Sequence, residues 1–402
     1  MKIAVIGGGM TGLTAAYELT QRGHAVTLFE KEKTLGGLAA GFKQPGWNWH
    51  LEGAYHHLFT NDHAIIELIN ELGITDKLIV KRPITGTYWQ GKSYHLDSPS
   101  SLLAFPGLSH GDKLRTGLLL GALKINPFWK PLESITAKKL FVTVGGNHAW
   151  ETLWEPLMIG KFGNFAETIA ASWLWARIKK RTPSLCYIAG GFHTLIDALA
   201  KSITKNGGKI LTSTAVSSIQ TLPFDKILIT VPTPIALKLI PNLSLTIPHL
   251  HAQTLILETK EPILKDTYWL NITDRSFPFL AVVAHTNFMD KKHYGGNHLT
   301  YFGNYLPEGH PYLFMTKEQL LKIFLPFIKH VSLHSPFSIL HSYLFNGPFA
   351  QPVHQLHYSK IAPKLETPIP GVYLANLDSI YPWDRGTNYA VELGKQAALA
   401  IA

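Results

Sequence analysis

The sequence predicts an α/β protein in which a Rossmann-like nucleotide-binding domain is interleaved with a second domain built from a mixed sheet and helices. A short apolar strand runs into a glycine-rich turn and a helix within the first 23 residues. Two later segments, near residues 190 and 371, again combine glycines with an apolar strand or helix. Long stretches of helical and β-like pattern separate these segments, so distant parts of the chain must combine to form the first domain.

The strand, turn and helix at the start of the chain have the form of a dinucleotide-binding βαβ unit. Gly7 allows the tight reversal, Gly9 lets the backbone approach a pyrophosphate, and Gly12 lets the helix pack closely on the strand. Met10 and Thr11 open the helix, whose N-terminus attracts a pyrophosphate through its free N–H groups and its dipole. These positions are therefore predicted to bind a dinucleotide.

An acidic residue ends the second strand of this unit. Residues 25–29 are largely apolar, and Glu30 follows them at the place where an acid holds a ribose 2′-hydroxyl, with Lys31 next to it. A carboxylate at this position favours an unphosphorylated ribose over that of NADP. The sequence therefore predicts FAD or NAD as the bound dinucleotide.

A second glycine pair, Gly36-Gly37, follows the acid and is succeeded by Leu38. With this pair the chain resembles the FAD-dependent amine oxidase and protoporphyrinogen oxidase superfamily. The resemblance implies FAD as the cofactor, and it implies that these three residues continue the contact with the FAD phosphates. The arginine that usually accompanies the pair is absent, because Ala39-Ala40 follow instead.

A second segment that resembles the superfamily covers residues 190–231. It contains another glycine pair, an apolar-periodic helix and a strand. The resemblance implies that the chain here returns to the FAD domain and that the backbone of Val216 contacts the adenine. The single cysteine, Cys186, lies before this segment and outside the C-terminal region, so we expect FAD to be bound non-covalently.

A third segment lies at the C-terminus, where a strand leads to a glycine turn and a final helix. In the superfamily this helix points its N-terminus at the flavin, where it stabilises the negative charge of the reduced ring. Asn376 stands where the superfamily usually has aspartate; it can hydrogen-bond phosphate or ribityl groups but cannot act as a carboxylate. The resemblance extends the predicted cofactor site to Asp384, Gly386, Thr387 and Asn388, with Thr387 suited to be the N-cap of the helix.

The pair His56-His57 lies in an unusual stretch, residues 52–62. Adjacent histidines in an extended segment point to opposite faces, and no suitably spaced carboxylate accompanies them, so no metal site is predicted. The stretch resembles the flavin-contacting segment of UDP-galactopyranose mutases, which implies that His56 lies beside the flavin. The alternative is that one of the two histidines packs in the core. His56 is the only candidate for a role in catalysis, and the catalytic residues of the second domain are not predicted.

The three matching segments set the predicted domain boundaries. Residues 1–80, 185–238 and 355–402 are assigned to the FAD domain, and residues 81–184 and 239–354 to the substrate domain. Within the substrate domain, the patterns predict helices over 114–123, 149–157 and 166–181, turns at 145–146 and 160–163, and strands over 254–258 and 280–284.

Composition limits the partners of the chain. A single cysteine excludes an intrachain disulfide and favours a reducing compartment, so we expect a cytoplasmic protein. The net charge of +10 comes with no nucleic-acid-binding motif, and no stretch is long and apolar enough to span a membrane. The apolar run 116–123 predicts a buried helix, a wall of a substrate entrance, or a peripheral contact with the inner face of a membrane. The sequence does not predict the oligomeric state.

Taken together, these features predict an FAD-dependent oxidoreductase, namely an oxidase, dehydrogenase or desaturase. Such an enzyme transfers a hydride from an apolar or amphipathic small-molecule substrate to flavin N5. No second G-x-G-x-x-G motif is present, so no built-in NAD(P)H domain is expected. The alternative is a flavoenzyme similar to UDP-galactopyranose mutase, which acts on a nucleotide sugar without net redox change.

Overall fold

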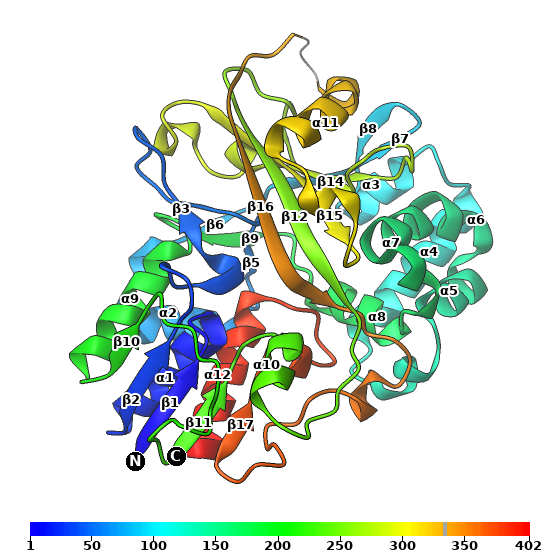
Figure 1. Cartoon of the computed structure of the whole chain (residues 1–402). Coiled ribbons are helices and arrows are strands. Elements are labelled where there is room, and N and C mark those ends of the chain that lie inside the picture. The colour runs from blue at the N-terminus through cyan, green and yellow to red at the C-terminus, as the bar shows by residue number, and fades with distance from the viewer. Residues whose placement is uncertain (333–335) are drawn as a thin grey trace.

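The computed structural model describes residues 1–332 and 336–402 and arranges them around two sheets (Figure 1). A parallel sheet of five strands lies in the half of the molecule that holds both termini. A mixed sheet of seven strands forms the other half, and a group of helices lies beside it. The chain passes between the halves several times, so the α/β fold and its mixed second sheet are as predicted.

The parallel sheet has the strand order β10-β2-β1-β11-β17. Its strands are β1 (Lys2–Ile6), β2 (Ala25–Phe29), β10 (Lys209–Leu211), β11 (Lys226–Ile229) and β17 (Val372–Leu374). Ile3 and Val5 of β1 contribute to one apolar cluster, and Ala4 and Ile6 to another, because successive side chains point to opposite faces. A strand that is buried on both faces is typical of a parallel sheet covered by helices.

Three helices pack together on one face of this sheet. They are α1 (Met10–Gln21), α9 (His193–Lys205) and α12 (Thr387–Ile401), with α1 in contact with both of the others. A Cβ built on Gly394 of α12 would lie 2.6 Å from the carbonyl oxygen of Thr11 and 2.8 Å from Cβ of Thr14. The first and last helices therefore touch almost backbone to backbone. The short helix α10 (Thr233–Leu239) contributes to the apolar cluster on the other face.

The mixed sheet has the order β16-β12-β15-β14-β13-β7-β8. Its strands are β7 (Ile84–Trp89), β8 (Lys92–His95), β12 (His249–Thr259), β13 (Thr267–Ile272), β14 (Ala281–Ala284), β15 (His298–Leu306) and β16 (Ile339–Pro352). Neighbouring strands are antiparallel except for β13 and β7. Helix α11 (Lys317–Val331) packs on it through Leu320, Phe324 and Ile328. The strands predicted over 254–258 and 280–284 are confirmed as parts of β12 and β14.

Most of the helices beside the mixed sheet come from residues 99–180. They are α3 (Pro99–Ala104), α4 (His110–Ile125), α5 (Ala137–Leu140), α6 (Asn147–Ala149), α7 (Glu155–Phe162) and α8 (Ala171–Lys180). The turn predicted over 160–163 was wrong in part, because α7 continues through Gly160 and ends only at Phe162. The helix predicted over 149–157 is interrupted by a π-helical turn, Trp150–Trp154. The helix predicted over 166–181 was wrong at its start, because a 3-10 turn ends at Thr168, Ile169 and Ala170 are extended, and α8 begins only at Ala171.

Two small sheets and the remaining helix connect the halves. One sheet pairs β3 (Gly41–Phe42) with β4 (Leu51–Glu52), and the other has the order β5 (Leu58–Phe59), β9 (Leu185–Ile188), β6 (Leu78–Lys81). Helix α2 (His63–Glu71) follows β5 and packs on α12. The loop that carries His56 and His57 runs from β4 to β5, between the two small sheets.

Candidate FAD and substrate site

The predicted glycine turn joins β1 to α1 in the conformation that the sequence requires. Gly7 has φ +111°, which L-residues with a side chain rarely adopt. A Cβ on Gly12 would lie 2.0 Å from the carbonyl oxygen of Gly7, so only glycine allows the helix to start this close to the strand. A Cβ on Gly9 would meet no protein atom within 4 Å. The backbone beside Gly9 is therefore open, as close approach of a pyrophosphate requires.

The second glycine pair lies directly against this turn. The N–H of Gly36 donates to the carbonyl oxygen of Gly8 at 2.8 Å, and a Cβ on Gly37 would lie 3.3 Å from Cα of Gly9. Gly36 and Gly37 have φ +110° and +56°, respectively. The two glycine segments thus form one continuous backbone surface at the N-terminus of α1, which fits a dinucleotide phosphate.

Glu30 lies beside this surface and is buried, with 8% of the residue exposed. Its Oε2 accepts from the N–H of Gly8 at 2.6 Å, and its Oε1 accepts from the N–H of Glu32 at 2.8 Å. A carboxylate has about four acceptor positions, so each oxygen can still accept a ribose hydroxyl. Lys31 is solvent-exposed and pairs with Glu32 at 3.2 Å, away from this carboxylate's contacts.

A cavity lies between the glycine surface and the mixed sheet. The free space among its lining residues is about 330 Å³, a figure that includes open solvent and is not the volume of an enclosed pocket. Its lining residues come from six segments of the chain: Leu38, Ala54, Tyr55, His56, Ala252, Thr254, Asn304, Tyr305, Ala350 and Arg385. The cavity therefore brings Leu38, after the glycine pair, together with His56 and the residues just before α12.

The two histidines have different surroundings, as predicted for neighbours in an extended segment. His56 lines the cavity, and its Nδ1 lies 2.6 Å from the carbonyl oxygen of Ala54. His57 does not line the cavity; its Nδ1 lies 3.1 Å from the hydroxyl of Tyr268. Burial lowers the pKa of His56 to about 4 and that of His57 to about 3. Both rings are therefore neutral at pH 7. Because Nδ1 of His56 donates to the carbonyl oxygen of Ala54, its Nε2 carries no hydrogen and can accept a hydrogen bond.

In the C-terminal segment, some of the predicted residues lie at the start of α12, and others are held by contacts inside the protein. The N-cap of α12 is Gly386, with Thr387 as the first helical residue, so the predicted N-cap was wrong by one position. The side-chain oxygen of Asn388 accepts from the N–H of Ile65 at 3.1 Å and so ties α12 to α2. The N-terminus of α12 follows Arg385 directly, so it lies at the end of the cavity.

Asp384 faces the second domain. Its Oδ1 accepts from the indole N–H of Trp173 at 2.9 Å, and its Oδ2 pairs with Arg177 at 2.5 Å. Burial raises the pKa of Asp384, but Arg177 and Lys161 outweigh burial and lower the pKa to about 2. The carboxylate is therefore an ionised anchor between the α12 loop and α8, and its contact with the cofactor stays a prediction.

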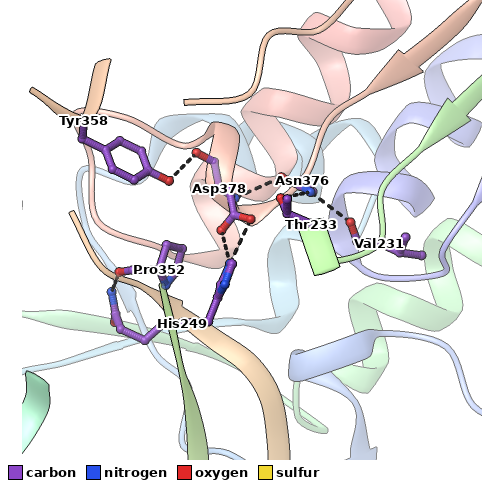
Figure 2. A network of polar contacts seen from close by, with 8 residues as sticks. Val231, Thr233, His249, Pro352, Tyr358, Asn376 and Asp378 are labelled. Atoms are coloured by element: carbon purple, nitrogen blue, oxygen red, sulfur yellow. Dashed lines mark hydrogen bonds and ion pairs between the residues drawn. The ribbon is translucent and has the colours of Figure 1, made fainter. Parts of the chain in front are cut away.

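Asn376 is engaged inside the protein, as Figure 2 shows. Its side-chain N–H groups donate to the carbonyl oxygen of Val231 and to the hydroxyl of Thr233, both at 3.0 Å. Its Oδ1 accepts from the N–H of Asp378 at 3.1 Å. Both amide hydrogens are thus used, and the predicted cofactor contact of this side chain has no free donor. Oδ1 keeps a second lone pair, so the cofactor contact of Asn376 stays a prediction, now limited to acceptance of a hydrogen bond by Oδ1 or to contact through its backbone.

The same network joins the two sheets (Figure 2). His249, the first residue of β12, places its Nε2 2.8 Å from Oδ1 and 3.0 Å from Oδ2 of Asp378, which follows β17. The hydroxyl of Tyr358 donates to the backbone oxygen of Asp378 at 2.9 Å. This buried pair fixes the point where the parallel sheet meets the mixed sheet.

A buried carboxylate near the cavity was missed by the sequence analysis. Glu52 is 1% exposed, and its carboxylate accepts from the hydroxyl of Tyr187 and from the N–H of Phe192, both at 2.7 Å. The hydroxyl of Tyr301 donates to the backbone oxygen of Glu52 at 2.8 Å. Burial raises the pKa of Glu52 to about 7. Its position two residues before the Ala54–His56 wall was visible in the sequence, but its partners were not.

Val216 lies in the loop after β10 and packs against the apolar cluster that includes Ile227 and Ile229. Its backbone contact with adenine stays a prediction. In the described part of the chain, no group of three or more metal-binding side chains is close enough to hold an ion.

Comparison with known proteins identifies the family. The family described as "Flavin containing amine oxidoreductase" matches residues 10–402. The chain belongs to this family. Its cofactor is accordingly FAD, and the residues around the glycine surface fit that cofactor.

Solved structures with a similar fold cover the whole chain. An Exiguobacterium protein assigned as a protoporphyrinogen oxidase has a TM-score of 0.78 at 17% identity, with 98% of its chain covered. Reduced UDP-galactopyranose mutase also has a TM-score of 0.78, at 15% identity and with 96% of its chain covered. At these identities the similarity establishes the fold. The resemblance to both groups that the sequence predicted is confirmed.

A similarity in sequence to desaturases is more limited. The zeta-carotene desaturase of Arabidopsis thaliana is 27% identical over 251 residues, which are 52% of this chain. The matched region spans 42% of the length of that desaturase. Together with the family match, this similarity supports an FAD-dependent oxidoreductase without defining its reaction. Among the described helices, none is both long and apolar enough to cross a membrane.

Proposed function

We propose that the protein oxidises an apolar or amphipathic small molecule by removal of a hydride, as an oxidase, dehydrogenase or desaturase. The observation that carries the proposal is the cavity between the glycine surface and the mixed sheet, in a chain of the flavin-containing amine oxidoreductase family. Apolar side chains from both halves, Leu38, Ala54, Ala252 and Ala350, line this cavity. The partial similarity to zeta-carotene desaturase supports a substrate with an apolar body.

The chain's own residues are assigned to binding and orientation. Glu30 would hold the ribose, the backbone at Gly9 and Gly37 would hold the pyrophosphate, and the N-terminus of α12 would face the flavin ring. Bound FAD supplies the hydride acceptor of such a reaction. The neutral imidazole of His56 would accept a hydrogen bond through Nε2 at the cavity wall. Because burial lowers its pKa to about 4, the ring is not a His⁺ proton donor at pH 7.

Anaerobic flavin bleaching tests this proposal. Purified protein is expected to be yellow and to release free FAD on denaturation. Apolar alkenes, amines and amphipathic acids are then screened for substrate-dependent loss of flavin absorbance, with NADPH as a control donor. We expect bleaching by a member of the screen and slow or no bleaching by NADPH. Bleaching by NADPH at a turnover rate, on the order of 10 per second, would instead indicate a reductase or mutase.

A mutase reaction is the second candidate, because reduced UDP-galactopyranose mutase shares the fold and His56 lies at the cavity. The test is conversion of UDP-galactopyranose after chemical reduction of the flavin. Conversion only by the reduced protein would support the mutase and contradict hydride removal. The matched control is the oxidised protein with the same substrate.

We further propose that α4 contacts the surface of an anionic membrane. Its outer face exposes Leu114, Leu118 and Ile125 by 64%, 65% and 78%, whereas Leu119 and Leu123 pack inward. The helix predicted as buried is therefore only half-buried. Leu103, Phe128 and Val144 extend the exposed apolar surface. Contiguous apolar surface of this kind marks an interaction site.

Charge favours a lipid surface over a second copy of the chain. Lys113, Arg115 and Lys124 of α4 donate to backbone carbonyl oxygens, and none has a carboxylate within 4 Å in the described structure. Two copies meeting through this face would bring like charges together, whereas anionic headgroups attract these cations.

A flotation assay with phosphatidylglycerol vesicles tests this contact. The wild type is expected to float with the vesicles, and Leu114→Glu/Leu118→Glu is not. Leu399→Glu on α12 is the exposed control; equal flotation of all three proteins, or dimerisation through α4, would contradict the proposal.

A further inference from the structure

One end of the cavity carries positive charge that no described carboxylate neutralises. Arg385 lines the cavity, donates from Nη2 to the hydroxyl of Tyr305, and donates from Nε to Oε1 of Gln351 at 2.9 Å. A guanidinium has five N–H donors, so three remain after these two bonds. Among the described residues, no carboxylate oxygen lies within 4 Å of this guanidinium.

A second cation approaches the same tyrosine from the substrate domain. Lys161, near the end of α7, is 9% exposed, and its Nζ lies 4.0 Å from the ring centroid of Tyr305. The rings of Trp173 and Phe162 are next, at 5.5 and 5.7 Å. Aromatic faces attract a cation but do not neutralise its charge. No carboxylate in the described structure lies within salt-bridge distance of this ammonium.

Asp384, the acid that attracts Lys161, does not balance these two cations. Asp384 attracts Lys161, but its oxygens are bonded to Arg177 and to the indole of Trp173. Its charge is therefore matched by Arg177. His354, another titratable group that faces this cluster, is neutral because burial lowers its pKa to about 4. Burial also lowers the pKa of Lys161 well below its usual range, and an anion bound beside Tyr305 would favour its charged form.

We propose that the substrate carries a carboxylate or phosphate group, which Arg385 binds while Lys161 supplies a second positive charge beside Tyr305. The inference rests on the proposed function, since it takes the cavity as the substrate site. The FAD pyrophosphate is assigned to the glycine surface around Gly9, so these two cations are not needed for it. The flavin ring, which the N-terminus of α12 would face, is the competing partner, and the midpoint potential distinguishes it from the substrate. The substrate is then amphipathic, with an apolar body along Ala252 and Ala350 and an acidic end at Arg385.

Ligand titration of the FAD-loaded protein tests this site without turnover. Benzoate and inorganic phosphate are the anionic probes, and benzamide is the uncharged counterpart of benzoate. Binding is followed by the change in flavin absorbance at constant ionic strength. We expect an anionic probe to bind, and Lys161→Met and Arg385→Met to weaken it at least about tenfold. Lys161→Arg keeps the positive charge and should bind the anion nearly as tightly as the wild type. Lys180→Met removes a cation from the ring of Trp383 and should leave the anion affinity unchanged.

Several outcomes would overturn the site. They are equal binding of benzoate and benzamide, no binding of either anion by the wild type, and unchanged anion affinity in Lys161→Met that still holds FAD. If Lys161→Met shifts the flavin midpoint potential and leaves anion affinity unchanged, the charge serves the cofactor. Anion binding by a protein that never oxidises a substrate would instead contradict the proposed reaction and leave the anion site intact. Melting temperature and FAD content of each variant show whether it is folded.

Discussion

The glycine surface and the cavity wall opposite it bind by different means. At the glycine surface, the shape of the backbone forms the site, and its parts lie within 31 residues of sequence, from Gly7 to Gly37. On the cavity wall, side chains form the site. They come from six separate segments and include those of Tyr305 and Arg385. The comparison teaches that a backbone-built site is specified locally, whereas a side-chain site is specified by the fold as a whole.

Substitution of two glycines should break the first region in two distinct ways. Gly12→Ala places a Cβ 2.0 Å from the carbonyl oxygen of Gly7, and we expect a loss of about 3 kcal/mol or more in the free energy of unfolding. Gly9→Ala meets no protein atom, so it should leave the apoprotein's stability almost unchanged. It should weaken FAD at least about tenfold, or 1.4 kcal/mol.

Urea unfolding of the apoproteins and FAD titration separate these effects. Gly117→Ala in α4 is the control, because a Cβ there also meets nothing and the helix favours alanine by about 1 kcal/mol. Full FAD affinity in Gly9→Ala would show that the open space beside Gly9 does not hold the cofactor.

Removal of the Glu30 carboxylate should remove a charge-assisted hydrogen bond to the ribose at the glycine surface. Glu30→Ala is expected to weaken FAD binding by about 1.5–3 kcal/mol, because the ribose hydroxyls lose an ionised acceptor. The N–H groups of Gly8 and Glu32 lose the same partner, so a small fall in stability is also expected. Isothermal titration with FAD measures the first effect. Unchanged affinity would mean that Glu30 supports the turn and does not touch the ribose.

Glu52 should make the stability of the second region depend on pH. In the unfolded chain its carboxyl titrates near 4.5, and in the folded protein burial raises the pKa to about 7. Between these values the folded state holds a proton that the unfolded state has lost, so stability falls as pH rises. From pH 5 to 7.5, the wild type should lose roughly 1–3 kcal/mol more than Glu52→Gln.

Urea unfolding at the two pH values measures this difference. Other titrating groups, such as Asp62, are common to both proteins and cancel in the comparison. A difference that stays constant with pH would mean that Glu52 is ionised in the folded protein, like an ordinary surface carboxylate.

The histidine pair gives the smallest expected effect and the sharpest comparison. His56→Ala removes a side chain from the cavity wall, so it should keep FAD but shift the flavin spectrum or midpoint potential. His57→Ala removes the contact with Tyr268 behind that wall and should do neither. Spectra of the oxidised proteins and redox titrations with a dye measure both. Wild-type spectra and potentials in both variants, or a shift in His57→Ala alone, would place His56 among packing residues.

The sequence predicted the first region well because its signals are local. Gly7, Gly9 and Gly12 have fixed spacings, and the packing of Gly36 and Gly37 against them follows from the same short unit. The internal hydrogen bonds of Asn376 were not predicted, since those to Val231 and Thr233 cross about 145 residues of sequence. No local pattern reports such a partner.

The second region was largely beyond prediction from sequence. Glu52 meets Phe192 across 140 residues, and Arg385 meets Tyr305 across 80. Lys161 was predicted to lie in a turn between two glycines, where a lysine is ordinarily exposed; α7 instead continues and buries it among aromatic rings. Burial of a charge depends on which elements pack around it, and that information is absent from a single segment.

The contact of α1 with α12 has a consequence for the order of events during synthesis. Helix α12, which packs against α1 through Gly394, is made hundreds of residues after α1. At about 5–20 residues per second, the ribosome needs roughly 20 to 70 s to make the residues between them. Throughout that interval the nascent α1 has one side without its partner, and the flavin end of the site does not yet exist. Capture of FAD is therefore expected only after α12 has been made and has docked on α1.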